Sequence, residues 1–146
     1  MIGLLQRVSQ ASVRVEQTLI ASIDTGLMVL VGIEHQDNEK QVDRLLQRLL
    51  CYRVFPDPDG KMNLSLADIQ GDLLLVPQFT LAADTRQGNR PGFSQAAQPD
   101  KASALFQYLS QEAARLYPGV QTGQFGADMQ VSLINEGPVT FWLQVP

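Results

Sequence analysis

Catalytic side chains of the usual kinds are scarce in this sequence, which has one cysteine and one histidine in 146 residues. Cys51 has no partner for an internal disulfide, as is common in a reducing compartment. Its place after Leu49 and Leu50, at the end of a predicted helix, favours a small buried hydrophobic residue. His35 lies in the polar run 34–40, which predicts an exposed loop. A Ser-His-Asp set or a zinc site therefore has too few members, and an enzyme with this sequence must act through backbone donors or through its substrate.

Long apolar runs, a basic surface and a phosphate-binding loop are also lacking. No apolar run approaches the roughly 20 residues of a membrane span, and residues 1–8 do not follow the signal-peptide pattern, so we expect a soluble cytoplasmic protein. Gly119, Gly123 and Gly126 neither follow a buried strand nor open a helix. The net charge of −4 disfavours a broad nucleic-acid-binding face. Any contact with RNA must be local and brief.

Hydrophobic residues make up 45% of the sequence, which is enough to form one core, and they recur with the periods of helices and strands. Residues 42–50 repeat at helical spacing after a capping box of Asn38 and Gln41, and a second helix begins near Pro99 and stops at 118–119. Strands are predicted at 2–8, 12–15, 19–23, 27–33, 52–55, 73–76, 121–125, 130–134 and 139–145. The pattern predicts one domain, residues 1–146, of the α/β class with a mixed sheet and two main helices.

Two segments next to predicted strands stand out, Gln78-Phe79-Thr80-Leu81 and Asn135-Glu136-Gly137-Pro138-Val139-Thr140. Taken alone, the first also fits the end of a strand and the second an ordinary hairpin turn. They occur in order with Gln6-Arg7-Val8, Gly60-Lys61-Met62-Asn63 and Ala127-Asp128-Met129-Gln130-Val131. In this combination the chain resembles the D-aminoacyl-tRNA deacylase (D-tyrosyl-tRNA deacylase) family over essentially its whole length.

The sequence departs from the usual pattern of that family at two positions. Pro77 stands where the family usually has serine before its Gln-Phe-Thr motif, and Glu136 where aspartate is common before Gly-Pro. Pro77 removes a hydroxyl and a backbone N–H, which leaves any role of that serine open in this chain. The defining motifs themselves are unchanged.

The resemblance implies a homodimer of strongly curved mixed-sheet domains with the active site at the subunit interface and with neither metal nor cofactor. Gln78, Phe79 and Thr80 would form the catalytic pocket, with backbone N–H groups near Phe79 and Thr80 as an oxyanion hole. Gly137 and Pro138 resemble the Gly-cisPro element that enters the pocket of the partner subunit. Its backbone would exclude an L side chain and admit a D residue or glycine.

Further roles follow from the same resemblance. Arg7 would hold the Gly-Pro element, although a surface arginine is equally compatible with its strand position. Phe125 and Met129 would contact the terminal adenine, although both also fit a core role. We place phosphate contacts at three cations, for which a solvated surface is the alternative: Lys61, Arg86 and Arg90.

The reaction that the resemblance implies is hydrolysis of the ester between a D-amino acid, or glycine, and the terminal ribose of tRNA, a proofreading step of translation. The vicinal 2′-hydroxyl of the RNA is then the best candidate for activating water. The partners would be a second copy of the chain and the 3′ end of aminoacyl-tRNA, with neither DNA nor a membrane. Two other interpretations stay open: a peptidase or esterase for free D-amino acid derivatives, and a non-catalytic binding or chromatin-associated module.

Overall fold

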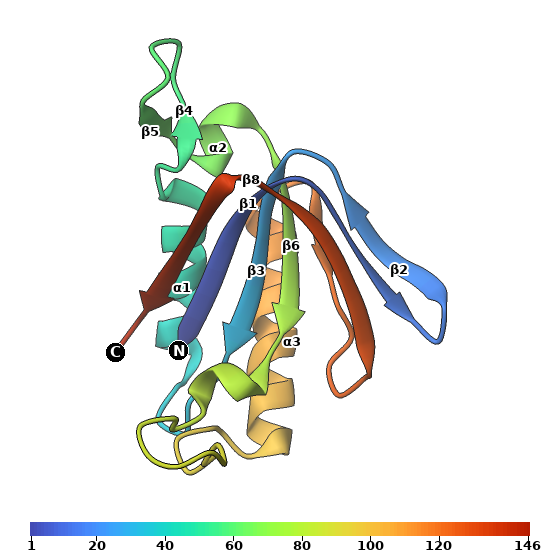
Figure 1. Cartoon of the computed structure of the whole chain (residues 1–146), viewed down its shortest axis with the longest axis vertical. Helices are drawn as coiled ribbons and strands as arrows, with labels where there is room; N and C mark the ends of the chain where they lie inside the picture. The colour runs from blue at the N-terminus through green and yellow to red at the C-terminus, as the bar shows by residue number, and fades with distance from the viewer.

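A six-stranded sheet that curls strongly on itself dominates the computed structural model, which describes residues 1–146 (Figure 1). The sheet order is β2-β1-β3-β6-β7, and β8 pairs with β1 outside this path. The strands of the sheet are β1 (Ile2–Val15), β2 (Thr18–Ile23), β3 (Gly26–Gly32), β6 (Asp72–Pro77), β7 (Val120–Thr122) and β8 (Met129–Gln144). A separate hairpin is formed by β4 (Phe55–Pro56) and β5 (Met62–Leu64). The helices are α1 (Glu39–Cys51), α2 (Leu66–Ile69), α3 (Pro99–Leu116) and the 3-10 turn η1 (Phe79–Ala82).

The curvature of the sheet comes from the length of β1. Its first half pairs with β3 and its second half with β2, while β8 runs antiparallel along its other edge from end to end. The parallel pairs β3·β6 and β6·β7 extend the sheet, and the Ser22 N–H donates to the Gln121 side chain (2.7 Å) between β2 and β7. The predicted mixed α/β fold with a curved sheet is confirmed. Two strands were predicted at 2–8 and 12–15, but they form the single strand β1. Two strands were likewise predicted at 130–134 and 139–145, and they form the single strand β8.

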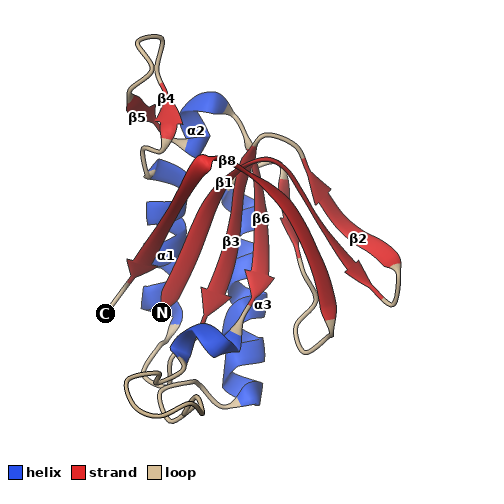
Figure 2. Cartoon of the chain, viewed as in Figure 1, coloured by secondary structure: helices blue, strands red, loops and turns tan.

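Helices α1 and α3 cover one face of the sheet (Figure 2), as their sequence patterns predict. The capping box at the start of α1 is present, with Asn38 accepting from the Lys40 N–H and Gln41 accepting from the Asn38 N–H. The larger core lies between this face and the helices, and a second apolar cluster fills the inner side of the curve. Both faces of β6 are therefore buried, which explains the unbroken apolar run from Leu73 to Val76.

Some predictions of local structure were wrong. Cys51 is exposed rather than buried, because the last residue of α1 turns away from the sheet. The predicted strand 52–55 is reduced to Phe55–Pro56, and α2 and β5 were not foreseen because each is only one turn or three residues long. None of the helices combines the length and the hydrophobicity that spanning a membrane requires.

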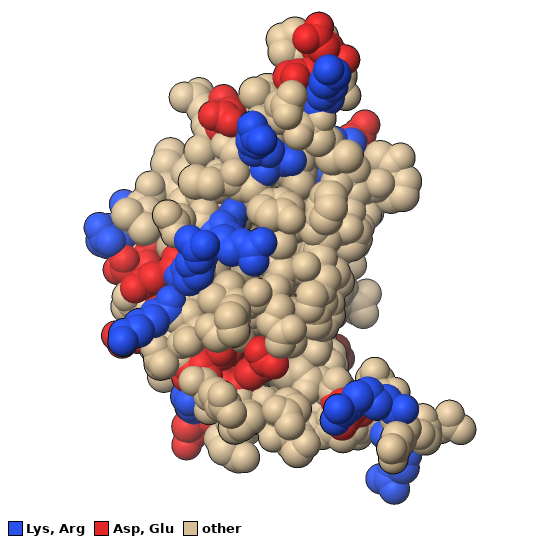
Figure 3. Space-filling model, turned by 90° about the vertical axis from the view of Figure 1, so that its left-hand side faces the viewer, with Lys and Arg blue, Asp and Glu red and all other residues tan.

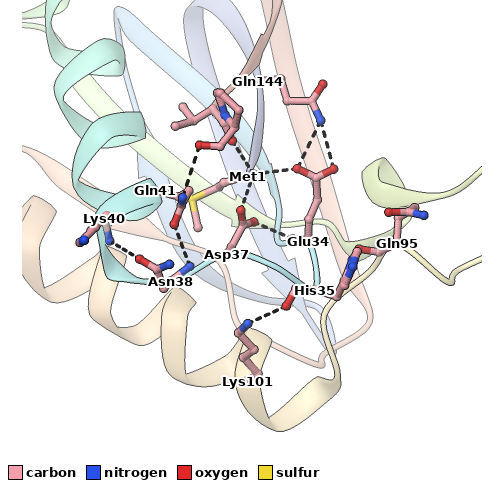
Figure 4. A network of polar contacts seen from close by, with 12 residues as sticks. Met1, Glu34, His35, Asp37, Asn38, Lys40, Gln41, Gln95, Lys101 and Gln144 are labelled. Atoms are coloured by element: carbon pink, nitrogen blue, oxygen red, sulfur yellow. Dashed lines mark hydrogen bonds and ion pairs between the residues drawn. The ribbon is translucent and has the colours of Figure 1, made fainter.

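The α-amino group of Met1 is buried in a network of acceptors just before the start of β1 (Figure 4). It donates to Glu34 Oε2 and Asp37 Oδ1, both at 2.7 Å, and to the Val145 carbonyl at 2.9 Å. Asp37 is itself buried and also accepts from the Glu34 N–H. The network ties the first strand, the β3 to α1 connection and the end of β8 together.

Replacing Asp37 by alanine is expected to destabilise the fold by about 3 kcal/mol, because a buried ammonium then loses one of its two carboxylates. Glu34, whose side chain is partly exposed, still shares the charge. The thermal midpoint should fall by roughly 5–10 °C, measured beside Asp59→Ala, which removes an exposed carboxylate of the β4–β5 turn. Equal midpoints for the two variants would contradict a stabilising role of this network.

Candidate active site

The Gln78–Leu81 segment forms a tight turn rather than the end of a strand. The Gln78 N–H donates to the Val31 carbonyl (2.8 Å), and the chain then enters the 3-10 turn η1. A Cβ on Gly32 would lie only 2.8 Å from Leu81 Cβ, so glycine is what lets η1 approach the end of β3 this closely. The turn leaves Phe79 standing out from the sheet with 57% of its surface exposed.

A cavity of about 490 Å³ opens beside this turn. Five segments supply its walls: the end of β6, the turn with Gln78 and Phe79, the start of α3 with the residue Ala97 before it, the loop before β8 and the first residues of β8. The lining residues are Val76, Pro77, Gln78, Phe79, Ala97, Pro99, Ala102, Phe125, Gly126, Ala127, Met129 and Val131. None of them carries an ionisable side chain, so no general base and no nucleophilic thiol lines the cavity.

The three residues predicted as catalytic lie together at the cavity mouth, but not all of them line it. Gln78 and Phe79 form part of the wall, whereas Thr80 is exposed and outside it. The Thr80 hydroxyl accepts a hydrogen bond from Gln78 Nε2 (2.5 Å). The Phe79 ring packs beside Phe93 of the following loop, with centroids 5.2 Å apart.

Phe125 and Met129, predicted to contact the terminal adenine, line the same cavity as Phe79. The Phe125 ring packs against Phe106 of α3, with centroids 6.3 Å apart, and the Gln124 N–H donates to the Met129 sulfur (3.3 Å). Both side chains are half-buried. Both side chains thus pack against the core and line the cavity, and their contact with an adenine stays a prediction.

The segment with Gly137 and Pro138 lies away from the cavity of its own chain. It is a bulge within β8, at the point where the pairing with the middle of β1 shifts register, and none of its residues lines the cavity. The peptide bond between Gly137 and Pro138 is cis, as the resemblance implied. Gly137 has φ +135°, a region that favours glycine.

Arg7 contacts the Gly-Pro segment directly. Its Nε donates to the Glu136 carbonyl (2.9 Å) and its Nη1 to the Val54 carbonyl (2.7 Å). A Cβ on Gly137 would lie 3.0 Å from Arg7 Nη2. Arg7 is thus half-buried beneath the segment and joins it to the base of the β4–β5 hairpin.

A model of the D-Tyr-tRNA(Tyr) deacylase family matches residues 4–144. The chain belongs to this family. A D-aminoacyl-tRNA deacylase of Janthinobacterium sp. is 60% identical over 99% of the chain and 97% of that relative. The proteins of the same name from Haemophilus ducreyi and Pseudomonas putida are 57% and 59% identical, each over 99% of the chain and 100% of the relative.

Two solved structures share the fold of this deacylase family member. One, titled "c-Myc DNA Unwinding Element Binding Protein", superposes with a TM-score of 0.95 at 36% identity and covers 100% of this chain and 99% of its own. The other, titled "Structural Analysis of a probable eukaryotic D-amino acid tRNA deacylase", has a TM-score of 0.83 at 20% identity and covers 99% of this chain and 98% of its own. The second likeness concerns the fold alone.

The three cations predicted to contact phosphates do not form one cluster in this deacylase family member, because Lys61 lies apart from Arg86 and Arg90. Lys61 lies in the β4–β5 hairpin, at the opposite end of the molecule from the loop that carries Arg86 and Arg90 (Figure 1). Arg86 is paired with Asp84 at 2.7 Å, and its hydrogen bonds hold the pKa of the Asp84 carboxyl well below its usual range. Figure 3 shows a band of Lys and Arg side chains on the α1 face instead. The sequence alone did not show that Lys61 lies far in space from Arg86 and Arg90.

Sequence reasoning missed the small residues of the cavity and the side chains that hold the Gly-Pro segment. Ala97, Ala102 and Ala127 leave the space that the cavity occupies. Asn135 and Thr140 bracket the segment. Alanines in loops and helices carry no distinctive signal in a sequence. Asn135 does carry one, because an asparagine beside a turn often bonds through its side chain to a backbone group a few residues away.

Proposed function

We propose that this chain is a D-aminoacyl-tRNA deacylase that hydrolyses the ester between a D-amino acid, or glycine, and the terminal ribose of tRNA. The observation that carries the proposal is the cavity without ionisable groups, set within a chain that belongs to this family along its length. Phe79, Phe125 and Met129 offer flat or polarisable apolar surfaces suited to an adenosine. Capture of one terminal nucleotide is also compatible with a net charge of −4.

The proposed catalytic groups are backbone N–H donors of η1. The first N–H groups of a helical turn have no partner within that turn, and here they belong to Phe79 and Thr80 at the cavity mouth. Donors fixed in this way stabilise the negative charge that develops on the ester carbonyl oxygen during attack by water. Gln78, on the cavity wall, is placed to hold the Thr80 side chain and the start of the turn.

The attacking water needs a group that positions it, and the cavity wall supplies no base. The 2′-hydroxyl next to the esterified 3′-oxygen is part of every aminoacyl-tRNA substrate and lies within reach of the carbonyl carbon. We assign the positioning of water to this hydroxyl. The protein then contributes orientation and charge stabilisation, and the RNA contributes the proton-handling group.

Chiral selection is assigned to Gly137 and Pro138 of a second copy of the chain. Two features support a cross-subunit arrangement: the segment is exposed and remote from its own cavity, and β8 also exposes Ile134 and Trp142, each at about half of its surface. Exposed apolar side chains beside a protruding backbone segment are typical of an interface. Backbone packed against the substrate α-carbon excludes an L side chain and tolerates hydrogen, which extends the activity to glycine.

The experiment that tests the function is deacylation of tRNA by the purified protein. D-tyrosyl-tRNA and glycyl-tRNA should be hydrolysed and L-tyrosyl-tRNA spared, while D-tyrosine esters without RNA should be left intact. Hydrolysis of the free ester at a similar rate would support an esterase or peptidase instead. Absence of all hydrolysis would support a non-catalytic module, for which binding to tRNA and to duplex DNA would be measured next.

Thr80→Ala is expected to keep the single-turnover rate within about threefold of wild type, because a hydroxyl without a neighbouring base is a weak nucleophile. The exposed hydroxyl only accepts a hydrogen bond from Gln78. Thr80→Pro, which removes the backbone N–H, should lower the rate much further. A trapped acyl-Thr80 species, or a folded but inactive alanine variant, would instead assign the chemistry to the side chain.

A further inference from the structure

We propose that Asn135 and Thr140 form a side-chain clamp that positions Gly137 and Pro138 and thereby sets how strictly the enzyme discriminates D from L substrates. The inference rests on the proposed function, because it assigns a role within the same chiral site. Neither residue touches the cavity. Both would act through the segment that they hold, as positioning residues.

The clamp lies where the pairing between β1 and β8 is interrupted. Val8 pairs with Asn135 and Gln6 pairs with Thr140, so the single residue Arg7 faces the four residues 136–139. An insertion of this size takes backbone groups out of the ladder, and those groups need other partners where water is partly excluded. The segment would otherwise be free to move about its two ends.

The side chain of Asn135 replaces one of the missing ladder bonds. Its Oδ1 accepts from the Val139 N–H at 2.9 Å, which closes the segment four residues further along the chain. Asn135 and Val139 are both half-buried, whereas residues 136–138 between them are exposed. The bond therefore draws the two ends of the segment together and leaves its middle protruding.

Thr140 fixes the orientation of that amide. Asn135 Nδ2 donates to Thr140 Oγ1 at 2.7 Å, which leaves the amide oxygen directed at the Val139 N–H. Arg7 holds the same segment from below at the Glu136 carbonyl. Three side chains thus grip the segment at positions on both sides of Gly137 and Pro138, and only Arg7 comes from outside β8.

Selection by exclusion depends on how closely this segment is held. An L side chain is rejected only while the backbone occupies the space that it would need, so a looser segment admits it more readily. The side chain of a D substrate points away from the segment, so the rate with a D substrate does not rise when the segment is looser. Loss of the clamp should consequently lower the D/L ratio of kcat/KM and not only the rates themselves.

The test compares Asn135→Ala, Thr140→Val and Thr140→Ser in deacylation of D-tyrosyl-tRNA and L-tyrosyl-tRNA, with enzyme in excess and thermal midpoints recorded. Asn135→Ala should lower the D/L ratio at least about tenfold. Thr140→Val should lower it in the same direction, and Thr140→Ser, which keeps the hydroxyl, should restore it. Ser132→Ala, an exposed position on the same strand paired with Ser12 of β1, is the matched control and should leave the ratio unchanged.

A merely structural role would lower both rates in proportion to the folded fraction and leave the ratio as it is. A wild-type ratio in folded Asn135→Ala and Thr140→Val, or a failure of serine to rescue, overturns the clamp while the proposed function stands. If Asn135→Ala does not fold, the near-isosteric and exposed Thr140→Val decides the question. Absence of deacylation by the wild-type chain would overturn the function itself and the clamp with it.

Discussion

Replacing the 2′-hydroxyl of the terminal adenosine by hydrogen, with the D-amino acid held on the 3′-oxygen, is expected to slow enzymatic hydrolysis at least about 100-fold. The reason is the composition of the cavity wall, which includes no side chain able to take or give a proton near neutral pH. A positioned acid or base group contributes roughly 100- to 10,000-fold in other enzymes. The 2′-hydroxyl is the group that remains to fill this role.

The measurement is a single-turnover rate with enzyme in excess, divided by the spontaneous hydrolysis rate of the same ester. This correction is needed because a vicinal hydroxyl also assists the uncatalysed reaction. Binding of the deoxy substrate should change far less than the rate. An undiminished corrected rate would transfer the role to a side chain, and Gln78 and Thr80 at the cavity mouth would be the first to examine.

Sequence patterns predicted local structure correctly where a helix or strand packs one face against a single surface. The α1 pattern and its capping box predicted the helix to within a few residues, because burial of one face and satisfaction of the first N–H groups are local requirements. β1 and β8 were each predicted as two strands. Their continuity depends on pairing with different strands along their length, which no local pattern contains.

The motifs named residues that meet at one cavity, but the shape of that cavity could not be read from the sequence. Phe79, Phe125 and Met129 do line one cavity, although they come from segments far apart in the chain. The expected cluster of Lys61 with Arg86 failed because its members lie at opposite ends of the fold. Which segments become neighbours depends on the order of the strands in the sheet. That order cannot be read from local patterns in a single sequence.

Arg7→Ala is expected to lower kcat/KM for D-aminoacyl-tRNA by about 100-fold, because the backbone of Gly137 and Pro138 would also position the substrate α-carbon, and displacing a positioning element by roughly 1 Å typically costs that much. The guanidinium donates to two carbonyls in different directions, Glu136 at 2.9 Å and Val54 at 2.7 Å. Lysine has a single ammonium on a flexible stem and lacks this fork, so Arg7→Lys should fail almost as badly. Arg14→Ala is the matched control, since Arg14 is an exposed arginine of the same strand that donates only to Gln17 nearby.

Mixing experiments extend the Arg7 prediction to the subunit arrangement. Arg7→Ala impairs the Gly-Pro segment but keeps its own cavity, whereas Ala127→Trp fills the cavity but keeps its own segment. If the segment acts in the partner's site, a mixed dimer contains one site with both parts intact, and an equal mixture should regain about a quarter of wild-type activity. Activity that stays at the level of the separate variants after the subunits have exchanged would place the segment and the cavity of each site within one chain. The exposed position of Gly137 and Pro138, away from their own cavity, would then need another explanation.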